Sequence, residues 1–136
     1  MTIVVLPQAA DEFDDATANY EDLQADLGRR FRDEVDRHIR WIAEHADVPR
    51  VRSGGYRRVN LKAFPYYVAY LRTGETVWIL AIAHGHREPE YWIDRKQNVS
   101  QQNAPGNSRH ASQLTVYENS NVIIAGHARF RRLCLS

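Results

Sequence analysis

Residues 77 to 83 form an unbroken apolar run, Val-Trp-Ile-Leu-Ala-Ile-Ala, between Thr76 and His84. Successive side chains of a β-strand point to opposite faces of its sheet, so a strand with this sequence is apolar on both faces. We therefore expect Thr76 to His84 to be a central strand that is covered on both sides. The rest of the chain has to supply those covering layers.

Two helices are predicted before this strand. Apolar residues recur at intervals of three and four along residues 8 to 26, which indicates an amphipathic helix. Gly28 interrupts the pattern, and a second stripe with the same spacing runs along residues 31 to 46. Pro49 ends the second helix near His45. Because almost no linker separates the helices, they should fold back on each other as a hairpin.

Three further segments are typical of strands. Ile3 to Leu6 is a short β-branched run closed by Pro7, which suits an edge strand. Tyr56 to Leu61 alternates in polarity, and Tyr66 to Arg72 is rich in aromatic residues. With Thr76 to His84, the last two segments predict an antiparallel meander. The predicted fold class is α+β, a helical hairpin packed on a small antiparallel β-sheet in the order β-α-α-β-β-β.

The second face of this sheet has no helix to cover it within residues 1 to 95. A partner protein and the C-terminal tail are the two candidates for that cover.

The chain has 136 residues, which is enough for one domain. We predict a domain over residues 1 to 95 and a C-terminal extension over residues 96 to 136. Gln97 to Ser112 is rich in Gln, Asn, Ser and Gly, as expected of a flexible segment. Leu114 to Tyr117 and Val122 to Ala125 could form a weak hairpin.

The composition points to a folded protein of the cytoplasm. It is 43% hydrophobic and 26% charged, which is usual for a soluble globular chain. The N-terminus lacks the features of a secretory signal, and no stretch approaches the roughly 20 apolar residues that span a bilayer. The single cysteine, Cys134, fits a reducing compartment.

Charge is divided unevenly along the chain. Residues 1 to 45 contain 5 basic and 11 acidic residues, whereas residues 46 to 96 contain 9 basic and 5 acidic residues. An acidic part therefore precedes a basic part, and a basic part can attract phosphate groups. Ordinary solvated charge is the alternative interpretation.

The segment from His84 to Trp92 carries the side chains best suited to chemistry, with two imidazoles, a guanidinium and a phenol. Cleavage of RNA without a metal needs a base for the 2′-hydroxyl, an acid for the leaving 5′-oxygen and cations for the charge on phosphorus. Histidine and arginine can fill these roles near neutral pH. Solvated residues, or residues that only bind, are the alternative. No metal and no cofactor is expected.

Three segments carry a resemblance to a known family. In the order of the sequence they are Gly54-Gly55-Tyr56-Arg57-Arg58-Val59, Phe64-Pro65-Tyr66-Tyr67-Val68-Ala69-Tyr70, and Ile79-Leu80-Ala81-Ile82-Ala83-His84-Gly85-His86-Arg87-Glu88-Pro89-Glu90-Tyr91-Trp92, closing with Arg95. Together with Leu27 to Val35, they resemble the RelE/ParE toxin superfamily, in particular members described as plasmid stabilisation proteins. The resemblance spans about residues 3 to 95 and leaves out the tail.

The resemblance implies a toxin of a type II toxin-antitoxin system, with a strand, a helical hairpin and an antiparallel meander. It also implies an antitoxin, encoded alongside, whose extended or helical segment wraps the toxin and masks its active surface. Such a segment would cover the open sheet face.

The superfamily divides by target. RelE-like members cut mRNA in the ribosomal A site, whereas ParE-like members inhibit DNA gyrase and need no catalytic set. We place ribosome-dependent mRNA cleavage, by a metal-independent endoribonuclease or mRNA interferase, ahead of gyrase inhibition. An inactive relative that only binds antitoxin is the third alternative.

By analogy with the RelE-like pattern, Arg57 or Arg58 and Lys62 would hold the scissile phosphate. His84 or His86 would be the base or the acid. The other roles, also from the resemblance, are transition-state stabilisation by Arg87, an auxiliary acid or stacking group in Tyr91, and substrate binding by Arg57, Trp92 and Arg95.

Overall fold

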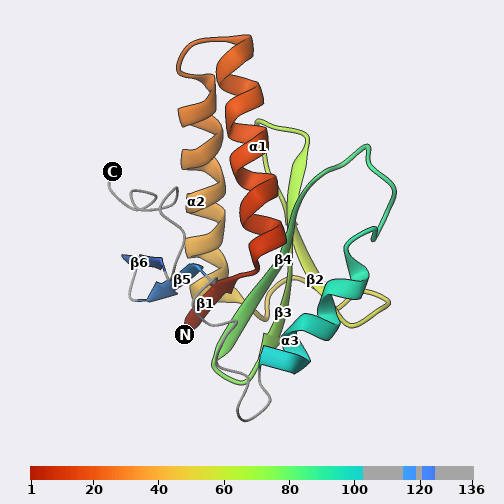
Figure 1. Ribbon diagram of the computed structural model, residues 1–136. Coiled ribbons are helices and arrows are strands. Elements are labelled where there is room, and N and C mark those ends of the chain that lie inside the picture. Colours follow the sequence, from red (N-terminus) through yellow and green to blue (C-terminus); the bar gives the residue numbers. More distant parts are fainter. Residues whose placement is uncertain (103–114, 119–120, 125–136) are drawn as a thin grey trace.

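The computed structural model describes residues 1–102, 115–118 and 121–124 (Figure 1). The elements up to residue 84 follow the predicted β-α-α-β-β-β order, which confirms the α+β fold class. They are β1 (Thr2–Val5), α1 (Pro7–Leu23), α2 (Leu27–His45), β2 (Arg57–Asn60), β3 (Tyr66–Thr73) and β4 (Thr76–His84). A 3-10 helix η1 (Ile93–Arg95), α3 (Lys96–Gln102), β5 (Thr115–Glu118) and β6 (Asn121–Ile124) follow.

The sheet is mixed, and its strand order is β2-β3-β4-β1-β5-β6. The meander β2-β3-β4 is antiparallel, as predicted. β1 pairs in parallel with β4, from Thr2 opposite Thr76 to Val5 opposite Ile79. The prediction that β1 is an edge strand is wrong, because β5 pairs with its other side. Pro7 does not interrupt this pairing, since it lies after the strand and opens α1.

The helical hairpin covers one face of the sheet (Figure 1). Aromatic and branched side chains from α1, α2 and the meander fill the space between the layers, among them Phe13, Phe31, Ile39 and Val68. At the start of α2 the helices approach closely, because a Cβ added to Gly28 would lie 2.6 Å from the backbone oxygen of Thr17.

The first helix is shorter than the pattern predicts and ends at Leu23, which is exposed. The chain needs residues 24 to 26 for the reversal into α2, and Asp26 adopts a positive φ of 76° there.

The opposite face of the sheet is covered by the chain itself. Trp92 and Val99 pack there against a second apolar cluster that includes Trp78, Leu80 and Tyr67. Of the two covers considered for this face, the tail supplies a part, because Val99 lies in the predicted extension of residues 96 to 136. Trp92, which directly precedes η1, supplies another part.

Residues 97–102, which were expected to be flexible, belong to the helix α3. The remainder of that predicted flexible segment and Cys134 lie outside the described residues. β5 and β6 pair antiparallel, from Thr115 opposite Ile124 to Glu118 opposite Asn121. No helix in the described part of the chain is both long and apolar enough to cross a membrane.

Candidate functional site

The end of the sheet where β3 begins and β4 ends brings the two predicted histidines together. His84 pairs with Tyr66 across the ladder, and the two rings lie 5.0 Å apart. The backbone N–H of His86 donates a hydrogen bond to Nδ1 of His84 at 3.0 Å, and the imidazoles are 5.1 Å apart. Because Nδ1 accepts this bond, the proton of neutral His84 is on Nε2.

Arg87 and Tyr91 lie next to this pair. The backbone N–H of Arg87 donates to the carbonyl oxygen of His84 at 3.1 Å, which closes a tight turn. The guanidinium of Arg87 lies 3.9 Å from the centre of the Tyr91 ring, a cation-π contact. His86 and Arg87 are exposed, so this rim of the sheet presents an imidazole and a cation to the solvent.

A carboxylate that the sequence analysis missed holds the following segment. Glu12 of α1 accepts hydrogen bonds from the Tyr91 hydroxyl, from both terminal nitrogens of Arg95 at 3.0 and 3.1 Å, and from the Ile82 backbone N–H at 3.2 Å. Arg95 also donates to the carbonyl oxygen of Leu80 at 3.0 Å.

The hydrogen bonds that Glu12 and Arg95 make to β4 follow from the pairing of that strand. β1 pairs with β4 only as far as Ile79, so the edge of β4 beyond it needs other partners. Glu12 and Arg95 supply them. The signal in the sequence was the position of Glu12, three residues after buried Ala9 and four before buried Ala16, because a carboxylate on an apolar stripe has to be paired.

This network changes the chemistry expected of Tyr91. Burial, followed by the hydrogen bond to Glu12 and its charge, raises the pKa of Tyr91 well above its ordinary value of 10.0. The hydroxyl proton is thus bound to a carboxylate and is hard to release. Arg95 is likewise paired, with its side chain 17% exposed.

The sheet separates two of the predicted catalytic groups. The guanidinium of Arg58 lies 4.3 Å from the centre of the Tyr67 ring, and Tyr67 belongs to the cluster on the α3 side. His84 instead contacts Tyr66, which packs with the helical hairpin. Because neighbouring residues of a strand face opposite ways, Arg58 and His84 lie on opposite faces.

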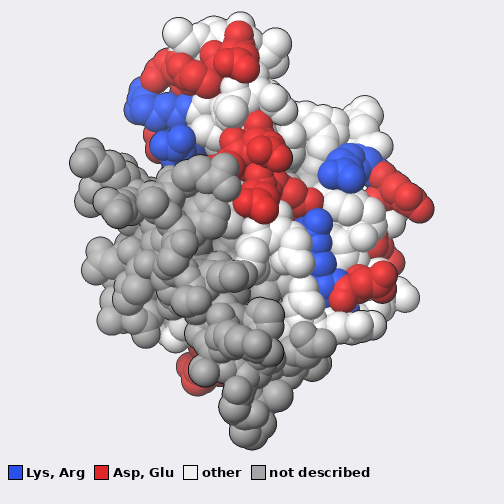
Figure 2. All heavy atoms as spheres, viewed as in Figure 1, with Lys and Arg blue, Asp and Glu red and all other residues white. Residues whose placement is uncertain are grey.

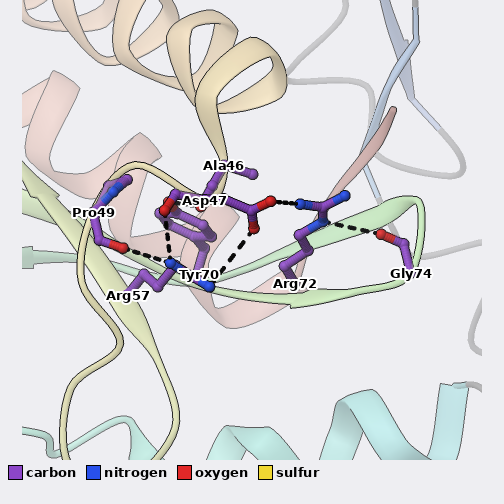
Figure 3. Close-up of polar contacts among 7 residues, drawn as sticks. All are labelled: Ala46, Asp47, Pro49, Arg57, Tyr70, Arg72 and Gly74. Atoms are coloured by element: carbon purple, nitrogen blue, oxygen red, sulfur yellow. Dashed lines mark hydrogen bonds and ion pairs between the residues drawn. The ribbon is translucent and has the colours of Figure 1, made fainter.

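Arg57 anchors the loop between α2 and β2 (Figure 3). Its guanidinium donates to the carbonyl oxygens of Asp47 at 3.0 Å and Pro49 at 2.6 Å. The Asp47 carboxylate pairs with Arg72, and the buried Tyr70 hydroxyl donates to the Ala46 carbonyl oxygen at 2.7 Å. The Arg72 hydrogen bond is the largest cause that lowers the pKa of Asp47 below its ordinary value. These contacts give Arg57 a role in holding the loop.

The last two predicted groups are Lys62 and Trp92. Lys62 is exposed and lines a groove beside α2. Trp92 is 1% exposed, and its Nε1 donates to the Tyr67 hydroxyl at 2.9 Å. A side chain buried in this way is a packing residue, and it has no surface on which a base could stack.

Among the residues that the structure describes, no three His, Cys, Asp or Glu side chains are grouped as a metal ion would require. Acidic side chains gather over α1 on the face shown in Figure 2, and α1 contains six acidic residues and no lysine or arginine.

The fold and this rim define a small α+β protein in which a helical hairpin covers one face of a mixed sheet and exposed His86 and Arg87 follow the end of β4. Residues 3–89 match the family model described as ParE toxin of the type II toxin-antitoxin system parDE. The chain belongs to this family, which is part of the RelE/ParE superfamily. It is therefore the toxin of a type II toxin-antitoxin system, and its family implies an antitoxin partner. A comparison with curated proteins gives no match.

Proposed function

We propose that this toxin arrests growth by binding its target, in the manner of the ParE-like members that inhibit DNA gyrase, rather than by cutting mRNA. The observation that carries the proposal is that Arg58 and His84 lie on opposite faces of the sheet. Cleavage of RNA needs a base, an acid and cations that converge on one phosphate group. The proposal reverses the order of the two alternatives drawn from the sequence.

Three other predicted site residues already have partners within the protein, which supports the proposal. Arg57 is held by the α2–β2 loop, and Tyr91 and Arg95 are bound to Glu12. Exposed His86 and Arg87 remain at the rim, on a loop that a partner protein could contact. A binding surface of this kind needs no convergent catalytic set.

A specific observation keeps mRNA cleavage as a second candidate. The His84 and His86 rings are 5.1 Å apart, and two neighbouring imidazoles can act as base and acid near neutral pH. Arg87 follows them directly. In this alternative, the RNA would lie across the rim.

Induction of the full chain in cells distinguishes the two candidates. Gyrase inhibition predicts DNA double-strand breaks and loss of supercoiling, without new mRNA 5′ ends. Neither His86→Asn nor the control His45→Asn on α2 should then change the pattern of mRNA 5′ ends. New 5′ ends within translated codons that disappear in His86→Asn would overturn the proposal and establish the nuclease, for which a loss of about 100-fold or more is expected.

A further inference from the structure

The antitoxin needs a docking surface other than the sheet face first considered for it, because Trp92 and Val99 already cover that face. A groove between α2 and β2 offers such a surface. It has a volume of about 620 Å³. Its walls are formed from α2 by Arg37, His38 and Trp41, and from β2 and its end by Val59, Asn60 and Lys62. We call it the β2–α2 groove.

One wall of the groove is the outer edge of β2. β2 is the outermost strand of the described sheet on this side. The N–H of Leu61 donates to the carbonyl oxygen of Tyr66, so the backbone groups of alternate residues 57, 59 and 61 face β3. Those of Arg58 and Asn60 consequently face outward. An extended segment could pair with them as an added strand.

The groove carries positive charge. Arg37 and Lys62 are exposed, and the carboxylate in the groove, Glu34, is only 5% exposed. One oxygen of Glu34 accepts the backbone N–H groups of Lys62 at 2.5 Å and of Ala63 at 3.1 Å. Because that carboxylate is committed to the backbone, the outer part of the groove favours acidic side chains on a partner.

The groove also contains an apolar anchor. Trp41 is 37% exposed, which is unusual for so large a side chain on a helix whose other apolar residues are mostly buried. It stacks on His45, with the ring centres 4.8 Å apart, and this contact limits its motion. Exposed aromatic side chains that are held in place are frequent at the centres of protein interfaces.

These observations select one occupant. A second copy of the chain, pairing β2 with β2, would bring Arg37 and Lys62 of both copies together. The chain's own residues 97 to 136 contain four basic residues and one acidic residue, so they do not complement the groove. We propose that the β2–α2 groove receives an extended, acidic segment of the antitoxin, which pairs with the outer edge of β2 and packs an apolar side chain on Trp41. The proposal depends on the chain being a toxin with an antitoxin, and not on which target it inhibits.

A matched pair of variants tests the charge of the groove. Arg37→Glu changes the groove, whereas Arg30→Glu makes the same change on α2 two turns away, also at an exposed position. The probe is the full-length antitoxin encoded beside the toxin gene, and its affinity for the full chain is measured by calorimetry. Arg37→Glu should weaken binding about tenfold or more, and Arg30→Glu should change it less than threefold. Equal effects of the two variants would overturn the proposal.

A second pair of variants tests the strand edge. Asn60→Pro removes an outward N–H without removing a hydrogen bond to β3, whereas Asn60→Ala keeps that N–H. Asn60→Pro alone should weaken antitoxin binding, with thermal unfolding as the check that both variants fold. In the wild-type complex, the amides of Arg58 and Asn60 should become protected from hydrogen exchange. Protection confined to other strands, or a toxin dimer formed through β2, would refute the placement.

Growth assays separate this proposal from the proposed target. Without antitoxin, Arg37→Glu should be as toxic as the unchanged chain, because the groove is distinct from the rim that carries His86. With antitoxin, it should escape neutralisation, whereas Arg30→Glu should not. Neutralisation of Arg37→Glu at the same antitoxin level as Arg30→Glu would count against the groove, whatever target the toxin has.

Discussion

Replacement of Glu12 tests whether the carboxylate on α1 holds the segment that follows β4. In Glu12→Ala, the Tyr91 hydroxyl and the Ile82 N–H lose their acceptor. Arg95 loses its carboxylate and keeps its hydrogen bond to the Leu80 carbonyl oxygen and its cation-π contact with Tyr91. The variant therefore leaves a partly buried cation without its partner carboxylate, which is among the more costly changes to a folded protein.

The size of the effect follows from burial. Removal of one partner of a fully buried ion pair costs about 3–5 kcal/mol. The side chains of Arg95 and Glu12 are 17% and 16% exposed, so water reaches them in part, and we expect a loss of about 2–3 kcal/mol in the free energy of unfolding. For a chain of this length, that loss lowers Tm by roughly 10 °C.

Urea unfolding of the full chain measures this loss, with Asp22→Ala as the control. Asp22 is an exposed acidic residue of the same helix, and its replacement should change stability by less than about 0.5 kcal/mol. Glu12→Gln, which keeps an acceptor but loses the charge, should lie between the two. In a double-mutant cycle with Arg95→Met, the coupling should be about 1–2 kcal/mol.

Two results would refute this reasoning. One is a Glu12→Ala variant no less stable than Asp22→Ala. The other is a coupling to Arg95→Met close to zero, which would mean that the hydrogen bonds of Glu12 do not hold Arg95 in solution. An increase in amide exchange at residues 86 to 95 of Glu12→Ala would, in contrast, support the role of Glu12 in ordering this segment.

Two other predictions concern packing and pH. Gly28→Ala should lower the free energy of unfolding, measured in urea, by about 2 kcal/mol, because its Cβ would lie 2.6 Å from the Thr17 backbone oxygen. The control Gly74→Ala has a φ of +59° but no atom within 4 Å of its Cβ, so it should cost only about 1 kcal/mol. Burial raises the pKa of Tyr70 from 10.0 to about 12. The unfolded chain loses this proton first, so the free energy of unfolding should fall as the pH rises from 10 to 12. In Tyr70→Phe, the slope of the free energy of unfolding against pH should be smaller by about 1.4 kcal/mol per pH unit. Equal pH slopes for the unchanged chain and Tyr70→Phe would contradict the prediction for Tyr70. A Gly28→Ala variant more stable than the unchanged chain would contradict the prediction for Gly28.

Much of the fold could be predicted from local patterns. The spacing of apolar residues located both helices, and the alternation in β2 placed Arg57 and Arg58 on opposite faces of the sheet. The apolar run of β4 required cover on both of its faces, which the two clusters provide. These properties depend on residues close together in the sequence, where the helical and strand periods fix which side chains share a face.

The candidate site could be predicted only in part. His84, His86, Arg87 and Tyr91 are close in sequence and lie together at the end of β4. The sequence could not assign the phenol of Tyr91 to Glu12, because 79 positions separate them and α1 has to pack over β4 before they meet. The grouping of Arg58 with the histidines assumed that neighbouring strands place their polar residues on one face.

The sequence by itself determined the order of the elements, the family and the groups gathered on the segment after β4. Only the tertiary structure decided that β1 lies within the sheet, that Trp92 and Val99 cover its second face and that β2 is the outermost of the described strands, beside the groove that contains Trp41. The physical reason is that periodicity specifies which residues of one element face the same way. Which element meets which, and which backbone groups stay unpaired, depends on packing between segments far apart in the chain.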